Sequence, residues 1–222
     1  MHTGFAAGRD AVGVVVSAAD RAGLTVLTFA DQAGPDATWL TAYADAVSRA
    51  RHRTELTLRV AAEVEVVRPD GWLALPPDLT RLDALSVAVS ALPCGDELLD
   101  APAIRARLTA GEMTAEQVAE GLVEAIVSGL ERASRYVPTQ LARPLALLAQ
   151  AGVDDAAVSP ALIAHLAAAC RATGTVVEIS EAWRSPSPRL VAMLRDAAVT
   201  LVPASDARYA VEVGGWQYLR RV

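Results

Sequence analysis

The spacing of apolar positions changes repeatedly along the chain and predicts alternating helices and strands. Apolar residues recur at helical spacing over residues 12–22, Gly23 ends that helix, and residues 24–29 have the composition of a buried strand. His2 and Asp31 flank these two elements. Because the loops at the carboxyl ends of parallel strands converge at one rim of a sheet, we expect His2 and Asp31 to lie close together.

The same alternation continues to the end of the chain, and capping residues support three of the later helices. Thr114 begins a capping box with Gln117, and Ser159 and Ser187 are each followed by a proline in the first helical turn. About six alternations favour an α/β fold, with a mostly parallel sheet and helices outside it, open or closed as a barrel. The predicted helices span 12–22, 35–50, 104–108, 114–130, 159–174 and 187–194, and the predicted strands span 24–29, 56–67, 82–90, 135–142, 175–180 and 199–203.

Composition narrows the class of protein. With 222 residues, of which 53% are apolar, the chain can bury a large core, and we expect one domain over residues 1–222. The net charge of -6 comes without long runs of like charge, so neither nucleic acid nor a membrane surface is an expected partner. Two cysteines are too few for a disulfide framework, which favours a cytoplasmic protein.

Polar residues stand at the predicted carboxyl end of nearly every strand. A parallel sheet would bring them to the same rim, where they are candidates for binding or catalysis. These residues are His2, Asp31, Gln32, Glu63, Ser90, Arg143, Glu178, Asp206 and Arg208, with Glu65 and Asp83 as weaker candidates.

The order of these residues resembles the PHP family, the polymerase and histidinol phosphatase domain. His2 resembles the second histidine of the family's opening His-x-His motif. Residues 28–32 resemble a strand end that closes in Thr-Asp-His, with Asp31 kept and Gln32 at the histidine. Residues 60–64 resemble the Gly-x-Glu segment, which keeps its carboxylate as Glu63.

The resemblance extends through the second half of the chain. Ser90 stands where a Ser-x-His strand end has its histidine, and Arg143 stands at the histidine of a His-Pro strand end. Glu178 lies in a segment of the Glu-Ile-Asn type. Asp206 and Arg208 belong to a segment similar to Ser-Asp-Ala-His, with arginine at the last position.

This resemblance implies a TIM-barrel-like fold, a distorted (β/α)7 barrel of PHP type that carries a centre for two or three metal ions. Met1 falls inside the opening motif, so the first strand would be absent or shortened. The family also implies a metal-dependent phosphoesterase-like hydrolase. Carried over to this chain, the remaining metal ligands are His2, Asp31, Glu63 and Asp206, enough for one ion at best.

Two arginines at ligand positions argue against a metal. A guanidinium group is always charged and cannot bind a cation, so Arg143 and Arg208 would repel a metal ion and pair with Glu63 or Asp206. The hypothesis that this favours is a pseudoenzyme without a cofactor. It would bind a small phosphate or carboxylate ligand, a protein partner or a second copy of the chain, and the ligand-binding residues would be Gln32, Ser90, Arg143, Glu178 and Arg208.

The alternative is a working phosphoric monoester hydrolase with a reduced site. One Zn²⁺ or Mn²⁺ would bind His2, Asp31, Glu63 and Asp206 and activate a water molecule. A third hypothesis is a metal-free enzyme, in which Asp31 or Glu63 acts as a general base while the arginines hold an anionic substrate.

Overall fold

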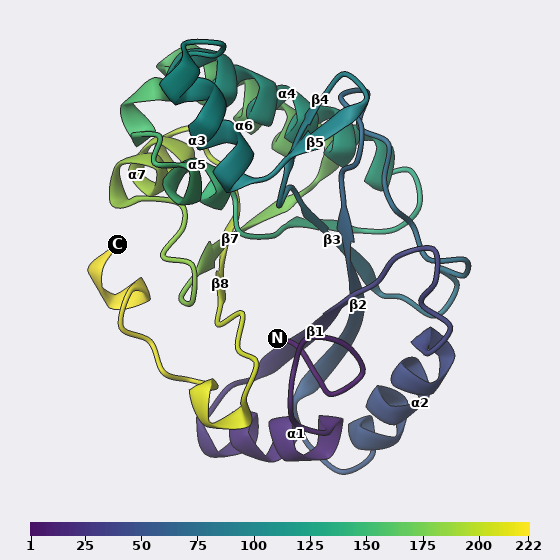
Figure 1. The fold of residues 1–222 in the computed structure, drawn as a ribbon. Coiled ribbons are helices and arrows are strands. Elements are labelled where there is room, and N and C mark those ends of the chain that lie inside the picture. Colours follow the sequence, from purple (N-terminus) through teal and green to yellow (C-terminus); the bar gives the residue numbers. More distant parts are fainter.

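The computed structural model describes residues 1–222, and its centre is a six-stranded parallel sheet that curls into an incomplete barrel (Figure 1). The first and last strands of the sheet are not paired with each other, so the barrel is open between them. The expected α/β, barrel-like fold is therefore confirmed in an incomplete form. In spatial order the strands are β1 (Val26–Gln32), β2 (Thr57–Glu65), β3 (Ala84–Ala88), β6 (Thr139–Leu141), β7 (Val176–Ser180) and β8 (Leu201–Ala204).

Helices cover the outer, apolar surface of the curved sheet. In Figure 1, α1 (Val12–Arg21) and α2 (Leu40–Arg51) lie along the β1–β2 side. The other helices cover the opposite half of the sheet, where α4 packs against β3 and α6. These helices are α4 (Ala115–Ala133), α5 (Ala146–Ala151), α6 (Pro160–Thr173) and α7 (Pro188–Asp196).

The predicted caps are present. Thr114 accepts a hydrogen bond from the Gln117 amide at 3.2 Å, and the Gln117 side chain accepts from the Thr114 amide at 2.9 Å, which completes the capping box of α4. Ser159 and Ser187 accept from the third residue of α6 and α7 respectively, each with proline in the first turn. Three helix starts were thus correctly predicted from local hydrogen-bonding chemistry.

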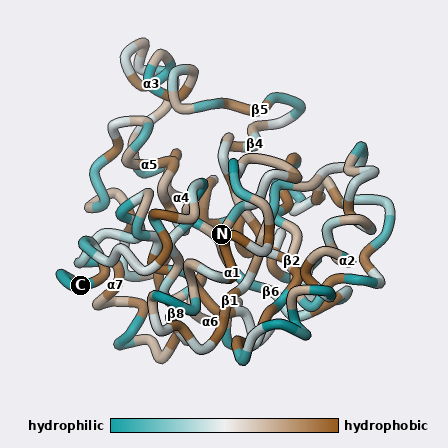
Figure 2. The backbone as a smooth tube through the Cα atoms, turned by 90° about the horizontal axis from the view of Figure 1, so that it is seen from below, coloured by the Kyte–Doolittle hydropathy of each residue, from teal (hydrophilic) through white to brown (hydrophobic).

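Residues 92–112, for which only the helix 104–108 is predicted, hold more structure than that. They form an antiparallel hairpin of β4 (Leu92–Cys94) and β5 (Glu97–Leu99), followed by α3 (Ala101–Ala110). Figure 2 shows this unit standing out from the rest of the molecule. Its helix is longer than predicted because Asp100 caps it, accepting from the Ala103 amide at 2.8 Å.

Other boundaries also differ from the prediction. Helix α2 begins at Leu40 instead of residue 35, because the stretch before it forms turns. Strand β6 keeps only three of its expected residues, since Tyr136 still bonds back to Ala133 at the end of α4. Helix α5 was not predicted, nor were three short 3-10 helices, η1 (Asp155–Ala157), η2 (Ala210–Glu212) and η3 (Leu219–Arg221).

The first residues of the chain lie between the carboxyl ends of β1 and β8. The Met1 carbonyl accepts from the Ala30 amide at 2.9 Å, and the His2 amide donates to the Ala207 carbonyl at 3.0 Å. Residues 1–3 therefore bridge the two open edges of the barrel at one level only. No helix of the structure has both the length and the apolar character needed to cross a membrane.

Candidate metal centre at the strand ends

Two backbone features fix His2 at the open seam of the barrel. Besides the bonds of residues 1–3 to both barrel edges, the loop after them folds back so that the Gly8 amide donates to the Thr3 carbonyl at 2.9 Å. A Cβ atom at Gly8 would lie 2.6 Å from the His2 carbonyl carbon and oxygen. Only glycine therefore allows this close return of the loop.

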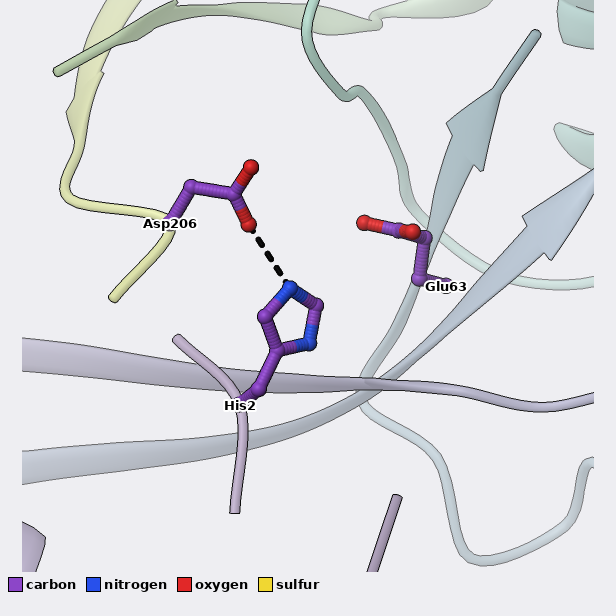
Figure 3. A group of neighbouring side chains, drawn as sticks. All are labelled: His2, Glu63 and Asp206. Atoms are coloured by element: carbon purple, nitrogen blue, oxygen red, sulfur yellow. Dashed lines mark hydrogen bonds and ion pairs between the residues drawn. The ribbon is translucent and has the colours of Figure 1, made fainter. Parts of the chain in front are cut away.

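His2 and Asp206 form a buried pair. The imidazole Nε2 lies 2.7 Å from Asp206 Oδ1 (Figure 3), and Nδ1 lies 3.9 Å from Asp31 Oδ1. His2 is 2% exposed. Although burial opposes ionisation of Asp206, the hydrogen bond and the charge of His2 lower its pKa to about 2. Asp206 is thus held as a carboxylate, which is the form that binds a cation.

Asp31 holds the first residues in place. Its Oδ1 accepts from the Thr3 amide at 2.7 Å, and its Oδ2 accepts from the Thr3 hydroxyl. Burial raises the pKa of Asp31, an effect that these two hydrogen bonds reduce. Because both oxygens are already engaged, the present role of Asp31 is to position the segment that carries His2.

Glu63 lies across the site from Asp206 and is bound to Arg143. The Arg143 Nη2 lies 2.9 Å from Glu63 Oε1, and the Gln32 side chain donates to the same oxygen at 3.2 Å. Burial raises the pKa of Glu63, whereas the charge of Arg143 lowers it. No hydrogen bond engages Glu63 Oε2, which leaves one oxygen of this carboxylate available to a ligand.

Arg143 enters the site from the end of β6, as expected from the sequence. It is 9% exposed, and its backbone has φ 45°, which directs the side chain away from the regular strand path. The guanidinium also lies 3.6 Å from Glu65, donates to the Ser90 hydroxyl at 3.2 Å, and stacks over Trp183 at 5.4 Å from the ring centroid. Burial opposes the charge of Arg143, but Glu63 and the other carboxylates raise its pKa.

Ser90 and Glu65 form a pair beside Arg143. The Ser90 hydroxyl donates to Glu65 Oε1 at 2.6 Å, and its amide donates to Oε2 at 2.9 Å. From the sequence, Glu65 was only a weaker candidate for the site. It stands two residues after Glu63 on β2, and this spacing puts both side chains on the same face of the strand. Trp183, in a turn after β7, carries no sequence signal that would have placed it here.

Glu178, on β7, is buried next to the Arg143 backbone. It accepts a hydrogen bond from the Arg143 amide at 3.3 Å and one from the Gln140 side chain. Burial raises its pKa to about 7. Gln140 was not among the predicted site residues. It stands three residues before Arg143, on the strand that supplies it.

Arg208 does not join this group. Its side chain is exposed and forms no ion pair, while its backbone bonds to Glu212 and Arg9. The expected pairing of Arg208 with Asp206 is therefore absent, and Arg143 is the one arginine at the centre. Asp83 is bonded to Arg51 and to the Val60 amide, outside the site.

The donor set of His2, Glu63 and Asp206 fits one divalent cation. Each residue offers a ligand atom, and these atoms lie within 4.8 Å of one another (Figure 3). Two buried atoms in the group, His2 Nδ1 and Asp206 Oδ2, have no hydrogen-bond partner. An orphaned carboxylate oxygen in the interior is costly unless something binds it, and a cation would satisfy it.

Comparison with known proteins gives a distant similarity. No family model matches the chain, and no curated protein matches it. Among solved structures, the crystal structure of N-isopropylammelide isopropylaminohydrolase from Burkholderia multivorans ATCC 17616 matches 88% of this chain at 18% sequence identity and a TM-score of 0.46. This chain spans 50% of the length of that structure. The PHP resemblance remains an expectation from the sequence.

Proposed function

We propose that the protein is a metal-dependent hydrolase with a reduced, one-ion centre formed by His2, Glu63 and Asp206, and that its substrate is a phosphomonoester. The observation that supports it best is the orphaned, buried Asp206 Oδ2 within a compact group of a histidine and two carboxylates. The bound Zn²⁺ or Mn²⁺ would supply a positive charge that polarises a phosphoryl oxygen and makes water a stronger nucleophile at neutral pH.

The chain's own residues have distinct roles in this proposal. Asp31 holds the segment that carries His2, through both of its oxygens. Arg143 binds the phosphoryl group, because its forked donors suit a phosphate and its guanidinium is kept beside Glu63 by Ser90 and Trp183. The exposed side chain of Gln32, which donates to Glu63, lies at the solvent-facing edge of the site.

Metal content is the first test. The protein is purified without chelator, incubated with Zn²⁺ or Mn²⁺, dialysed and analysed by elemental mass spectrometry, beside the variant Asp206→Asn. We expect about one equivalent in the natural protein and less than about a tenth in the variant. Asp83→Asn is the matched control, since Asp83 is a carboxylate outside the site. Equal metal content in the natural protein and both variants would refute the proposed metal centre.

Hydrolysis is tested separately with p-nitrophenyl phosphate. The metal-loaded protein should release nitrophenol, and both a chelator and Asp206→Asn should abolish the release. Arg143→Gln should raise KM more than it lowers kcat if Arg143 mainly holds the phosphoryl group. If the protein binds metal but hydrolyses neither this substrate nor a panel of other phosphomonoesters, the proposed hydrolase activity is contradicted. The protein would then be a metal-binding protein.

The second candidate is a module that binds an anionic ligand without hydrolysis. It is favoured by the 2.9 Å ion pair of Arg143 with Glu63, in which the guanidinium supplies a positive charge beside the carboxylate. Under this hypothesis the natural protein takes up no metal and binds inorganic phosphate, and Arg143→His gains metal. Phosphate binding measured by calorimetry with and without Zn²⁺ separates the two candidates, because the hydrolase binds phosphate more tightly when the metal is present.

A further inference from the structure

A cavity of about 710 Å³ lies between α1 and α2, which are neighbours on the β1–β2 side of the molecule (Figure 1). Its lining includes Val12, Val16 and Asp20 of α1, and Ala46 and Ala50 of α2, at the spacing of one helix face. None of the proposed metal ligands lines it. Pockets for small molecules commonly measure about 300–1,000 Å³, so this cavity is large enough for a small organic ligand.

Three arginines line this cavity, and none of them has a partner. The guanidinium groups of Arg9, Arg49 and Arg53 form neither an ion pair nor a hydrogen bond. Arg51, which stands between two of them in the sequence, does form an ion pair, with Asp83 outside the cavity. The unpaired state therefore distinguishes the arginines of the cavity from their neighbour.

The charge of this cavity is opposite to that of the whole protein. Asp20 is the one carboxylate in the lining, and it accepts a hydrogen bond from the Thr54 hydroxyl at 2.8 Å. Three positive charges and one negative charge thus border the same space, although the protein has a net charge of -6. Guanidinium groups that share a cavity repel one another, and an anion bound between them would relieve that repulsion.

The first turn of α1 adds backbone donors to the same cavity. No side chain caps this helix, and the amides of Val12 and Gly13 form no hydrogen bond, although both residues line the cavity. A Cβ atom at Gly13 would meet nothing within 4 Å, so the space beside this residue is open. Free amides and the helix dipole attract anions to the start of a helix, which is the same preference that the arginines create.

Apolar side chains also line the cavity. Val12, Val16 and Ala50 are buried, and Phe5 is half-buried, with its ring centroid 5.7 Å from that of Tyr43. A simple inorganic anion would leave this apolar surface in water. A ligand with an aromatic or apolar body would cover it and gain about 25 cal/mol for each Å².

We propose that this cavity binds a nucleotide, with its phosphate groups on the arginines and the first amides of α1 and its base against the apolar side chains. Forked guanidinium donors and free amides suit phosphate oxygens, and Phe5 offers an aromatic ring to the base. The site is separate from the metal centre, and the proposal does not depend on the proposed hydrolysis.

Calorimetry with three probes tests the binding. The full protein, without added divalent metal, is titrated with the methylene analogue of ATP, whose bridging carbon prevents loss of the terminal phosphate. Inorganic pyrophosphate and adenosine are titrated separately, and we expect each to bind at least about ten-fold more weakly than the analogue, because each makes only part of the contacts. Pyrophosphate that binds as tightly as the analogue, or no heat from the analogue at about 1 mM, would overturn the proposal.

Protein variants locate the binding. Arg49→Gln and Arg53→Gln should each weaken the analogue about ten-fold, since each loses a charge-assisted hydrogen bond, whereas Arg135→Gln, at an exposed and unpaired arginine outside the cavity, should not. Arg143→Gln should also leave the affinity unchanged, and the NMR signal of the Gly13 amide should shift on binding. If Arg143→Gln abolishes binding while the other variants bind normally, the analogue occupies the metal centre and the proposal is overturned.

Discussion

Glu178 makes the stability of the fold depend on pH. Burial raises its pKa from 4.5 to about 7, so between these values the folded protein holds a proton that the unfolded chain has released. The folded state then binds more protons, and the free energy of unfolding falls as the pH rises through this window. At about 1.4 kcal/mol per pKa unit, the rise of the Glu178 pKa from 4.5 to about 7 means that the free energy of unfolding is roughly 3 kcal/mol lower at pH 8 than below pH 4.5.

The variant Glu178→Gln removes this titration and keeps the shape of the side chain. Its free energy of unfolding, relative to that of the natural protein, should be about 2–3 kcal/mol higher at pH 8 than at pH 5, as measured by urea denaturation with equal m-values at each pH. Glutamine offers one acceptor oxygen in place of two to the Arg143 amide and the Gln140 side chain, at both pH values, so the loss of the second oxygen cancels in the comparison. Glu120→Gln, at an exposed glutamate, is the control and should show no such difference. A difference that stays constant from pH 5 to 8 would refute the proposed titration of Glu178.

Three further changes test how the site is supported. Thr3→Val removes the hydroxyl that donates to Asp31, and it should lower the free energy of unfolding, measured by urea denaturation, by about 1–3 kcal/mol. An unchanged free energy of unfolding would mean that Asp31 does not hold the segment that carries His2. Gly8→Ala puts a Cβ 2.6 Å from the His2 backbone, so metal uptake should fall several-fold, while Gly13→Ala, where nothing lies within 4 Å, should take up metal normally. Thr114→Ala removes the cap of α4 and should lower the free energy of unfolding by about 1 kcal/mol, with normal metal uptake. A loss of free energy smaller than the one that the same substitution causes at an exposed threonine outside a cap would contradict the role of the cap.

The sequence predicted the elements whose signals are local. The helices that begin at Thr114, Ser159 and Ser187 were predicted because each cap is a short-range hydrogen bond. The hairpin of residues 92–99 was not, since its pairing depends on packing against α4, which the local pattern does not contain. Strand propensity likewise predicted that β6 begins at residue 135. In the structure, the residues there form the turn that ends α4 instead.

The rim of the sheet was predictable, but the direction of each side chain was not. A parallel sheet brings the carboxyl ends of its strands together, so His2, Glu63, Arg143 and Asp206 meet although they are far apart in sequence. Arg208 is only two residues from Asp206, yet it turns to solvent because the chain leaves β8 through a residue with φ 48° at Asp206. Neither periodicity nor motif order contains that backbone angle.

The orientation of Arg208 changes the electrostatic argument about function. With two inward arginines, the positive charges could balance Glu63 and Asp206 and still hold an anion. With Arg143 alone, an anion in the site would face more carboxylate than guanidinium charge, and two unit charges 4 Å apart interact by about 4 kcal/mol at an effective dielectric constant near 20. A divalent cation would be attracted by the same carboxylates. Its positive charge would offset theirs, so that an anionic substrate could bind. Under the proposed function, we therefore expect the cation to bind first and the phosphate second, with Arg143 contacting the phosphate instead of replacing the metal.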